Sequence, residues 1–381
     1  MNAERGMDFY SRGFYRPEGF CDGLSLPGYR DVSPVTREAF AYDFYPARGN
    51  FTATPTHPSA AGSPIAGDST APLLIWVHGG AWRFGTNRGL REETVATPAG
   101  PRLNRQTLMR RALQERGWAV ASINYRYSHQ ALFPGALHDL KEAVRYFRVH
   151  AERFGIDPAR IAVAGGSAGG HLSMMAALTG GETRSELHEY YEGLASSRYP
   201  GATSRVVAAA SFYGVSDLRT IFSDRPLAGY ALAHPEDDGA EWRLLGCEYP
   251  VPTPEAWQGL VPGIGREQAA LNWERAHPLD FVTVRDPAGD REGVSGAPGI
   301  KPATKKSAPL IMVHGIADSC VPYQQSVRVY RALRSLQQPT DLVLVPGAEH
   351  GDSRCFSPDI IRRIINFLDA GVQIARPESA A

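Results

Sequence analysis

The chain has 381 residues, and its 40 basic and 40 acidic side chains leave a formal charge of zero at neutral pH. That balance gives no reason to expect nucleic acid or an anionic membrane surface as a partner. With no apolar stretch long enough to span a bilayer and no secretory signal at its start, we expect a cytoplasmic protein that acts on a small molecule, in one large domain or two average ones.

The first 71 residues predict little regular structure. Residues 1–35 are rich in Tyr, Phe, Gly and Pro without a clear period, and we expect an N-terminal arm packed on the surface of a domain. Residues 38–45 alternate enough to form an edge strand. Residues 46–71 are rich in Pro, Thr, Ser, Ala and Gly, so they predict a long loop.

Strands and helices then alternate up to residue 213. The run 73–77 is continuously apolar, as expected for a strand that is buried on both faces. The following elements are a helix over 108–116, a strand over 118–124, a helix over 134–154, a strand from 161 and a strand over 205–212. Asp139, Glu142 and Arg145 lie opposite the apolar positions of their helix, so we expect them to be solvated. The alternation predicts a mostly parallel sheet with helices on both faces.

The most informative stretch is 161–171, where a short apolar strand breaks into a serine between glycines. Gly165, Ser167 and Gly169 form the pattern G-x-S-x-G, and a helix over 172–178 follows. Strand, one-residue turn and helix are the geometry of a nucleophile elbow, in which glycines let strand and helix approach closely. A dinucleotide fingerprint would need glycine at position 167, and the Gly-Lys-Ser/Thr of a P-loop is missing. An ordinary strand-to-helix turn is the remaining alternative.

Two insertions follow the elbow. Residues 218–280 do not continue the alternation and predict a partly helical lid over the pocket. The aromatic residues of this lid either line the substrate site or form the lid's own core; they are Trp242, Tyr249, Trp257 and Trp273. Residues 286–307, rich in Gly, Pro and Lys, predict a flexible excursion. Order resumes with strands over 309–315 and 341–345 and helices over 323–337 and 357–370, and we expect a single domain over 1–381.

A serine hydroxyl needs a base within hydrogen-bond reach and a third group that fixes the tautomer of that base. His350 lies in a glycine-bounded loop after the last strand, and Asp318 follows the strand before it. Neighbouring parallel strands deliver both side chains to the same edge of the sheet. We therefore assign Ser167 as nucleophile, His350 as base and Asp318 as the acid that orients the base. Asp217, which follows the strand that ends at residue 212, is the competing acid.

Three further histidines and two cysteines lie near these motifs. His78 and His314 precede glycines at strand ends, and His171 is on the elbow helix, so we expect structural hydrogen bonds from all three. A regulatory disulfide between Cys320 and Cys355 is conceivable, but two reduced thiols are the expected state. Four cysteines without C-x-x-C spacing predict neither a disulfide scaffold nor a zinc site.

Five motifs in order along the chain resemble the α/β-hydrolase superfamily. They are His78 to Trp82, Gly165 to His171, Phe212 to Gly214, His314 to Asp318 with Val321 and Pro322, and Gly347 to Gly351. The nearest branch is similar to the carboxylesterases of the hormone-sensitive lipase type and to bacterial feruloyl and acetylxylan esterase-like proteins. The resemblance covers about residues 73–370 and implies the α/β-hydrolase fold, acyl-enzyme chemistry and no metal or organic cofactor.

The resemblance also implies where the substrate binds. The backbone N–H groups of Gly80, Ala81 and Ala168 would form the oxyanion hole. Ala81 stands where the family has the third glycine of HGGG. A backbone donor survives this change, but a preference for bulky tertiary alcohols is no longer implied. Substrate contacts are expected at Trp82, Phe84 and Tyr213.

We interpret the chain as a serine esterase that cleaves a carboxylic ester of a small to medium organic substrate through an acyl-enzyme. Cleavage of an amide, peptide or formamide is an alternative, since residues 212–217 and 314–322 also resemble prolyl-oligopeptidase catalytic domains. A third alternative is a biosynthetic acyl-transfer or cyclisation enzyme, or a binding module, on the same fold. The acyl group, the alcohol or amine and the oligomeric state are left open by the sequence.

Overall fold

The computed structural model describes residues 10–16, 36–48, 70–91, 94–95, 102–180, 185–233, 239–247, 260, 264–282 and 307–374. The predicted excursion over 286–307 lies outside the described residues, except for its last position. Most of the predicted loop over 46–71 and most of the N-terminal arm over 1–35 also lie outside them.

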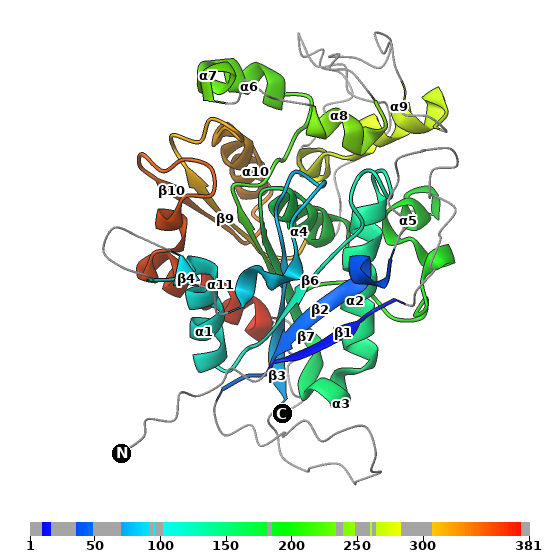
Figure 1. Cartoon of the computed structure of the whole chain (residues 1–381), viewed down its shortest axis with the longest axis vertical. Helices are drawn as coiled ribbons and strands as arrows, with labels where there is room; N and C mark the ends of the chain where they lie inside the picture. The colour runs from blue at the N-terminus through cyan, green and yellow to red at the C-terminus, as the bar shows by residue number, and fades with distance from the viewer. Residues whose placement is uncertain are drawn as a thin grey trace.

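An eight-stranded sheet runs through the centre of the molecule (Figure 1), in the order β1-β2-β6-β3-β7-β8-β9-β10. The strands are β1 (Ser11–Phe14), β2 (Ala41–Tyr45), β3 (Ala71–Val77), β6 (Ala119–Ile123), β7 (Ile156–Gly166), β8 (Ala209–Phe212), β9 (Leu310–Gly315) and β10 (Thr340–Val345). A separate pair is formed by β4 (Thr94–Val95) and β5 (Arg102–Leu103). β2 is antiparallel to both its neighbours, and the ladder from β6 to β10 is parallel throughout. The predicted α/β fold class is confirmed, and the loops at the carboxyl ends of the parallel strands meet at one edge of the sheet.

The prediction of an edge strand over 38–45 is wrong in two respects. Arg37–Phe40 form a short 3-10 helix, and β2 begins only at Ala41. β2 also has β1 on its outer side, with Ser11 opposite Phe44, so the N-terminal arm supplies the edge strand. β1 has only four residues, too few to show the alternation from which a strand is predicted.

Helices cover both faces of the sheet and enclose two apolar cores. Alternate strand residues point to opposite faces, so Ile75 of β3 belongs to one core, whereas Leu74 and Trp76 belong to the other. The first core packs against α2 (Gly135–Val149), α4 (Ala168–Thr179) and α10 (Gln324–Ser335), and the second against α1 (Arg105–Glu115) and α11 (Pro358–Ile374). Beside α2 lie α3 (Ala151–Phe154), which continues the predicted 134–154 helix after a break, and α5 (Ser185–Glu192). None of the described helices combines the length and apolar character needed to cross a bilayer.

The charged side chains of α2 are buried, so the prediction that Asp139, Glu142 and Arg145 are solvated is wrong. Asp139 and Glu142 have no exposed surface, and Arg145 is 1% exposed. Segments distant in the sequence cover them: Arg126 Nη2 lies 2.8 Å from Asp139 Oδ1, and Arg145 pairs with Glu192. Charges inside a protein persist where they are paired and hydrogen-bonded, so this face of α2 is a buried polar interface.

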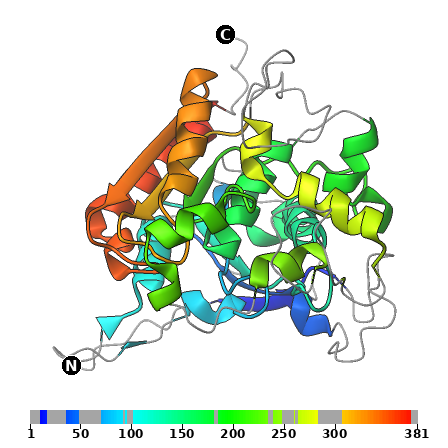
Figure 2. The same cartoon turned by 90° about the horizontal axis from the view of Figure 1, so that it is seen from above.

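Short helices that follow β8 gather at one end of the molecule (Figures 1 and 2). They are α6 (Ile221–Leu227), α7 (Tyr230–Ala233), α8 (Ala240–Leu245), α9 (Arg266–Arg275) and the 3-10 helix Pro278–Phe281. Trp242 and Trp273 are buried and stacked, with ring centroids 5.6 Å apart, and both belong to the first apolar core. Tyr249 and Trp257 lie outside the described residues. The lid function of residues 218–280 stays a prediction.

Candidate active site

Ser167 occupies the one-residue turn between β7 and α4. Its backbone has φ 55° and ψ −119°, which residues with a Cβ rarely adopt. Such a conformation costs of order 1–3 kcal/mol and persists where its surroundings enforce it. Ser167 N–H donates to Phe212 O of β8 over 2.9 Å, and Ser167 O accepts from His171 N–H over 2.9 Å. The strained turn is therefore held from the sheet and from the helix.

Gly165 and Gly169 lie where β7, α4 and the end of β3 meet. A Cβ added to Gly169 would lie 2.1 Å from Val77 O, and one added to Gly165 would lie 2.5 Å from the carbonyl carbon of Gly169. Neither position has room for a side chain. The glycines of the G-x-S-x-G pattern therefore allow the close approach that the sequence predicts.

The three side chains assigned from the sequence are joined by two hydrogen bonds. Ser167 Oγ is 3.0 Å from His350 Nε2, and His350 Nδ1 is 2.8 Å from Asp318 Oδ2. An ionised carboxylate can only accept, so Nδ1 carries the proton and Nε2 of the neutral ring accepts from the serine hydroxyl. This arrangement allows the imidazole to take the proton of Ser167.

Asp318 is fixed by several donors. Its side chain has no exposed surface, and Oδ1 accepts from the N–H groups of Cys320 at 3.0 Å and Val321 at 2.8 Å. Burial raises the pKa of this carboxyl, but hydrogen bonds from His314 and His350 outweigh burial and lower the pKa to about 2. Asp318 is therefore ionised at neutral pH.

Two side chains outside the assigned triad support it: His314 lies beside the acid, and Glu349 connects the loops of the acid and the base. His314 Nε2 lies 3.4 Å from Asp318 Oδ2. Glu349 Oε2 accepts from Ser319 N–H at 3.1 Å and from His350 N–H at 3.2 Å. Sequence reasoning gave His314 a structural role and missed Glu349. No sequence signal marks this bridge, because it depends on the distance between two loops.

The loop after β3 lies against the elbow. A Cβ added to Gly79 would be 3.3 Å from Ser167 Cβ. Gly80 has φ 108°, where a side chain would be strained. Within the part of the chain that the structure describes, the N–H groups of Gly80, Ala81 and Ala168 donate to no acceptor. Unpaired backbone N–H groups beside a nucleophile are what an oxyanion hole requires.

The three aromatic residues expected to contact the substrate differ in exposure and in the rings that they contact. Trp82 is 2% exposed, and its ring is edge-on to that of His171. Tyr213 is 5% exposed, and its ring is edge-on to that of His350 with centroids 4.9 Å apart. Phe84 is 60% exposed. Tyr213 thus contacts the base, and the contact of all three residues with substrate stays a prediction.

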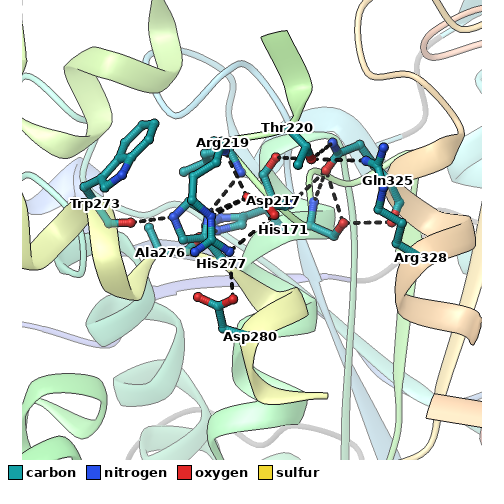
Figure 3. Close-up of polar contacts among 12 residues, drawn as sticks. His171, Asp217, Arg219, Thr220, Trp273, Ala276, His277, Asp280, Gln325 and Arg328 are labelled. Carbon is teal, nitrogen blue, oxygen red and sulfur yellow. Dashed lines mark hydrogen bonds and ion pairs between the residues drawn. The ribbon is translucent and has the colours of Figure 1, made fainter. Parts of the chain in front are cut away.

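Asp217, the competing acid, belongs to a separate buried network (Figure 3). Its Oδ1 is 2.9 Å from Arg219 Nε and 3.3 Å from His277 Nδ1. Burial raises the pKa of Asp217, but electrostatic interactions with His277 and Arg219 and the hydrogen bonds from Arg219 outweigh burial and lower it. The carboxylate beside His350 is that of Asp318.

His78 and His171 make structural hydrogen bonds, as predicted. His78 Nδ1 lies 2.7 Å from Gly79 O, and its ring stacks on that of Tyr125 with centroids 4.4 Å apart. His171 Nε2 lies 2.9 Å from Ala276 O. Burial lowers the pKa of both rings to about 4, so both are neutral at pH 7.

The cysteines Cys247, Cys320 and Cys355 are free thiols, so no disulfide joins the acid and base loops. Burial raises the pKa of Cys355 to about 12, which keeps this thiol protonated. Among the residues that the structure describes, no three His, Cys, Asp or Glu side chains are grouped so that they could hold a metal ion.

Comparisons with known proteins relate the chain to hydrolases. The BD-FAE family matches residues 63–262, just over half of the chain, and the prolyl oligopeptidase family matches residues 273–374. Among its relatives are the probable carboxylic ester hydrolase LipM and the esterase LipC, both of Mycobacterium tuberculosis. Each is 29% identical over 284 residues, which is 74% of this chain. The chain spans about half the length of these relatives, 49% of LipM and 53% of LipC.

Solved structures share the fold. A truncated form of a carbohydrate esterase from gut microbiota has a TM-score of 0.57 at 21% identity, covering 95% of this chain and 100% of its own. An acetyl ester-xyloside bifunctional hydrolase from Caldicellulosiruptor lactoaceticus has a TM-score of 0.52 at 18% identity, covering 94% of this chain and 96% of its own. At these identities the likeness shows the α/β-hydrolase fold alone.

Proposed function

The chain belongs to the BD-FAE family, and from that premise we propose that it is a serine carboxylic ester hydrolase. The observation that carries the proposal is the hydrogen-bonded series of Ser167, His350 and Asp318, with 3.0 Å and 2.8 Å between successive polar atoms. The esterase activities given in the names of LipM and LipC support it.

In the first half of the proposed reaction, Ser167 Oγ attacks the carbonyl carbon of the ester while His350 Nε2 takes the hydroxyl proton. The carbonyl oxygen becomes an oxyanion, which backbone N–H groups stabilise. These donors are the N–H groups of Gly80, Ala81 and Ala168. The bond to the alcohol oxygen then breaks, and His350 gives its proton to the leaving alkoxide. Asp318 keeps Nδ1 protonated and stabilises the imidazolium.

In the second half, water takes the place of the alcohol. His350 removes a proton from the water molecule as its oxygen attacks the acyl carbon of the acyl-enzyme. The bond to Ser167 Oγ breaks, His350 returns the proton to that oxygen, and the carboxylic acid leaves. Each half thus begins and ends with a neutral imidazole.

The proposed substrate is a carboxylic ester of a small to medium organic molecule. The edge-on contact of Tyr213 with His350 supports a place for this ring beside the reacting ester. The exposure of Phe84, just beyond the proposed oxyanion loop, supports contact with the outer part of a substrate. Trp82 is buried, which favours support of the loop over direct substrate contact.

Cleavage of a peptide or formamide is a second candidate. The match of residues 273–374 to the prolyl oligopeptidase family favours it, and the same acyl-enzyme chemistry would serve. A panel of p-nitrophenyl esters, a proline p-nitroanilide peptide and N-formylkynurenine separates the two. The esterase proposal expects the highest kcat/KM for an ester, and faster cleavage of an amide would favour the second candidate.

Hydrolysis of p-nitrophenyl acetate and butyrate tests the proposal. The full chain is expected to be active, and Ser167→Ala is expected to lose about 10³-fold or more in kcat because the nucleophile is gone. Circular dichroism checks that the variant is folded. A fully active Ser167→Ala variant would remove the proposal.

We also propose that the protein acts in the cytoplasm. Its described cysteines are free thiols, which is consistent with a reducing compartment. A tagged chain is expected to fractionate with a cytoplasmic marker, and recovery with secreted or membrane markers would contradict this location.

A further inference from the structure

The proposed oxyanion loop contains two consecutive strained residues. Ala81 has φ 50° and Trp82 has φ 57°, in the left-handed region that residues with a Cβ rarely adopt. Such positions persist only where surrounding contacts hold them. Because the N–H of Ala81 is a proposed oxyanion donor, whatever holds this pair also places the donor.

Packing holds the ring of Trp82. The residue is 2% exposed, and the indole N–H has no acceptor among the described residues, so no hydrogen bond fixes the ring. The backbone carbonyl accepts from Ser128 N–H over 2.7 Å. The ring itself lies edge-on to His171, with centroids 5.2 Å apart and planes at 89°. The imidazole of His171 thus brings a contact from the elbow helix to this ring.

His171 joins the elbow to a distant segment. It lies in the first turn of α4, four positions after the nucleophile, and its side chain has no exposed surface. Nε2–H donates to Ala276 O over 2.9 Å, which fixes the orientation of the ring. The ring that touches Trp82 is therefore fixed relative to both Ser167 and Ala276.

A buried polar network fixes Ala276 in turn (Figure 3). The next residue, His277, accepts from Leu218 N–H at Nδ1 over 3.0 Å and donates through Nε2 to Trp273 O. Arg219 lies 2.7 Å from Asp280 and also pairs with Asp217. Gln325 of α10 accepts from the N–H groups of Ser216 and Asp217 at 2.9 Å and 2.8 Å. The Ala276 carbonyl, which accepts the hydrogen bond from His171, is thus linked to the loop after β8 and, through that loop, to α10.

We propose that His171 is a positioning residue for the oxyanion loop: its ring braces Trp82 against the elbow helix and so holds the N–H of Ala81 where the oxyanion develops. The proposal rests on the proposed esterase function. The contact of the ring with Trp82 does the bracing, and the hydrogen bond to Ala276 orients the ring.

Two variants separate the ring contact from the hydrogen bond. His171→Phe keeps a ring against Trp82 and removes the donor to Ala276, whereas His171→Gln keeps an N–H donor and removes the ring. If the ring braces the loop, His171→Gln loses at least about tenfold in kcat with KM changed less than about threefold, and His171→Phe retains most of kcat. A role confined to structural support through the hydrogen bond predicts the reverse order.

A transition-state mimic gives a second readout. An alkyl trifluoromethyl ketone forms a hemiketal with the serine oxygen, the hydroxyl proton passes to His350, and the former carbonyl oxygen becomes the oxyanion. Its Ki is expected to rise in His171→Gln by about the factor by which kcat/KM falls. Thr179→Val, at the far end of α4, removes a buried hydrogen bond to Met175 O and is the matched control. It is expected to lower Tm without changing kcat or Ki.

The outcomes are distinguishable. A wild-type chain that hydrolyses no ester, or a fully active Ser167→Ala variant, ends the proposed function. A wild-type esterase in which His171→Gln leaves kcat and Ki unchanged, or in which His171→Phe is impaired as much as His171→Gln at equal folded fraction, overturns only the positioning role.

Discussion

At the scale of single residues, the identity of the carboxylate beside His350 decides the chemistry. Asp318 Oδ2 accepts from His350 Nδ1, whereas Asp217 Oδ1 is engaged with Arg219 and His277. The surroundings lower the pKa of both carboxyls, so both are ionised at neutral pH. The two candidate acids therefore differ in their position relative to His350 and not in their ionisation at neutral pH.

We expect Asp318→Asn to lower kcat by about 10⁴-fold, because an amide nitrogen facing Nδ1 imposes the wrong tautomer on the imidazole. Asp217→Asn leaves the triad in place, and its kcat should stay within about tenfold of the wild type. Steady-state hydrolysis of p-nitrophenyl butyrate at pH 7, corrected for the folded fraction, measures both. Equal losses in the two variants would refute the assignment.

At the scale of elements, helix α2 contributes a buried cluster of charges. Lys141 Nζ lies 2.6 Å from Glu192 Oε1, Arg145 pairs with the other oxygen of that carboxylate, and Ser204 Oγ donates to it at 2.6 Å. Burial raises the pKa of Glu192, but Lys141 and the other donors outweigh burial and lower it. The Glu192 carboxylate therefore pairs with two buried cations and ties the end of α5 to α2.

Glu192→Ala should lower the free energy of unfolding by about 3–5 kcal/mol, because it removes the buried carboxylate that pairs with both Lys141 and Arg145. Urea denaturation followed by circular dichroism measures the change. The matched control is Arg362→Ala, which breaks an exposed pair with Asp359 at 3.1 Å. It should cost less than about 1 kcal/mol. A loss in Glu192→Ala as small as in the control would contradict the role of the cluster.

The parts of the fold that depend on local patterns were predictable from the sequence. Continuous apolar runs marked β3 and β9, and helices were predicted where α1, α10 and α11 lie, with ends shifted by a few residues. The parts set by distant contacts were not. Arg145 lies opposite the apolar positions of its helix, where a solvated side chain is expected. It is buried because Glu192, a residue distant in the sequence, pairs with it. β1 has four residues and acquires its strand conformation by pairing with β2.

In the active site, too, the features set by local patterns were predictable and those set by distant contacts were not. Ser167, Asp318 and His350 could be predicted to come together, because each follows a strand of one parallel ladder and chain order limits the choice. A structural hydrogen bond from His171 could be predicted, but its acceptor Ala276 and the bridge made by Glu349 could not, since each depends on a contact between segments whose spacing the sequence does not encode.

At the scale of the whole molecule, three neutral histidines lie inside the assembled fold. They are His78 after β3, His171 on α4 and His277 before the 3-10 helix Pro278–Phe281. Burial lowers the pKa of each ring to about 4, from an unfolded value of about 6.5. Between these values the unfolded chain binds more protons than the folded one. The free energy of unfolding is therefore greatest above pH 6.5 and falls as the pH drops towards 4.

Each of these histidines can contribute up to about 3 kcal/mol to that loss. We expect Tm, measured by differential scanning calorimetry from pH 7.5 to 4.5, to fall progressively below about pH 6.5. His171→Phe removes one titrating group, so its Tm should depend less steeply on pH over the same range. A wild-type Tm that is constant or rises as the pH drops would contradict the burial of neutral rings.

Covalent labelling measures directly whether Ser167 is an activated nucleophile. The full chain is treated with a fluorophosphonate at pH 7, digested and mapped by tandem mass spectrometry. The label is expected on Ser167, absent from Ser167→Ala and formed more slowly in Asp318→Asn. A label on another residue, or undiminished labelling of Ser167→Ala, would contradict the claim that Ser167 is the nucleophile.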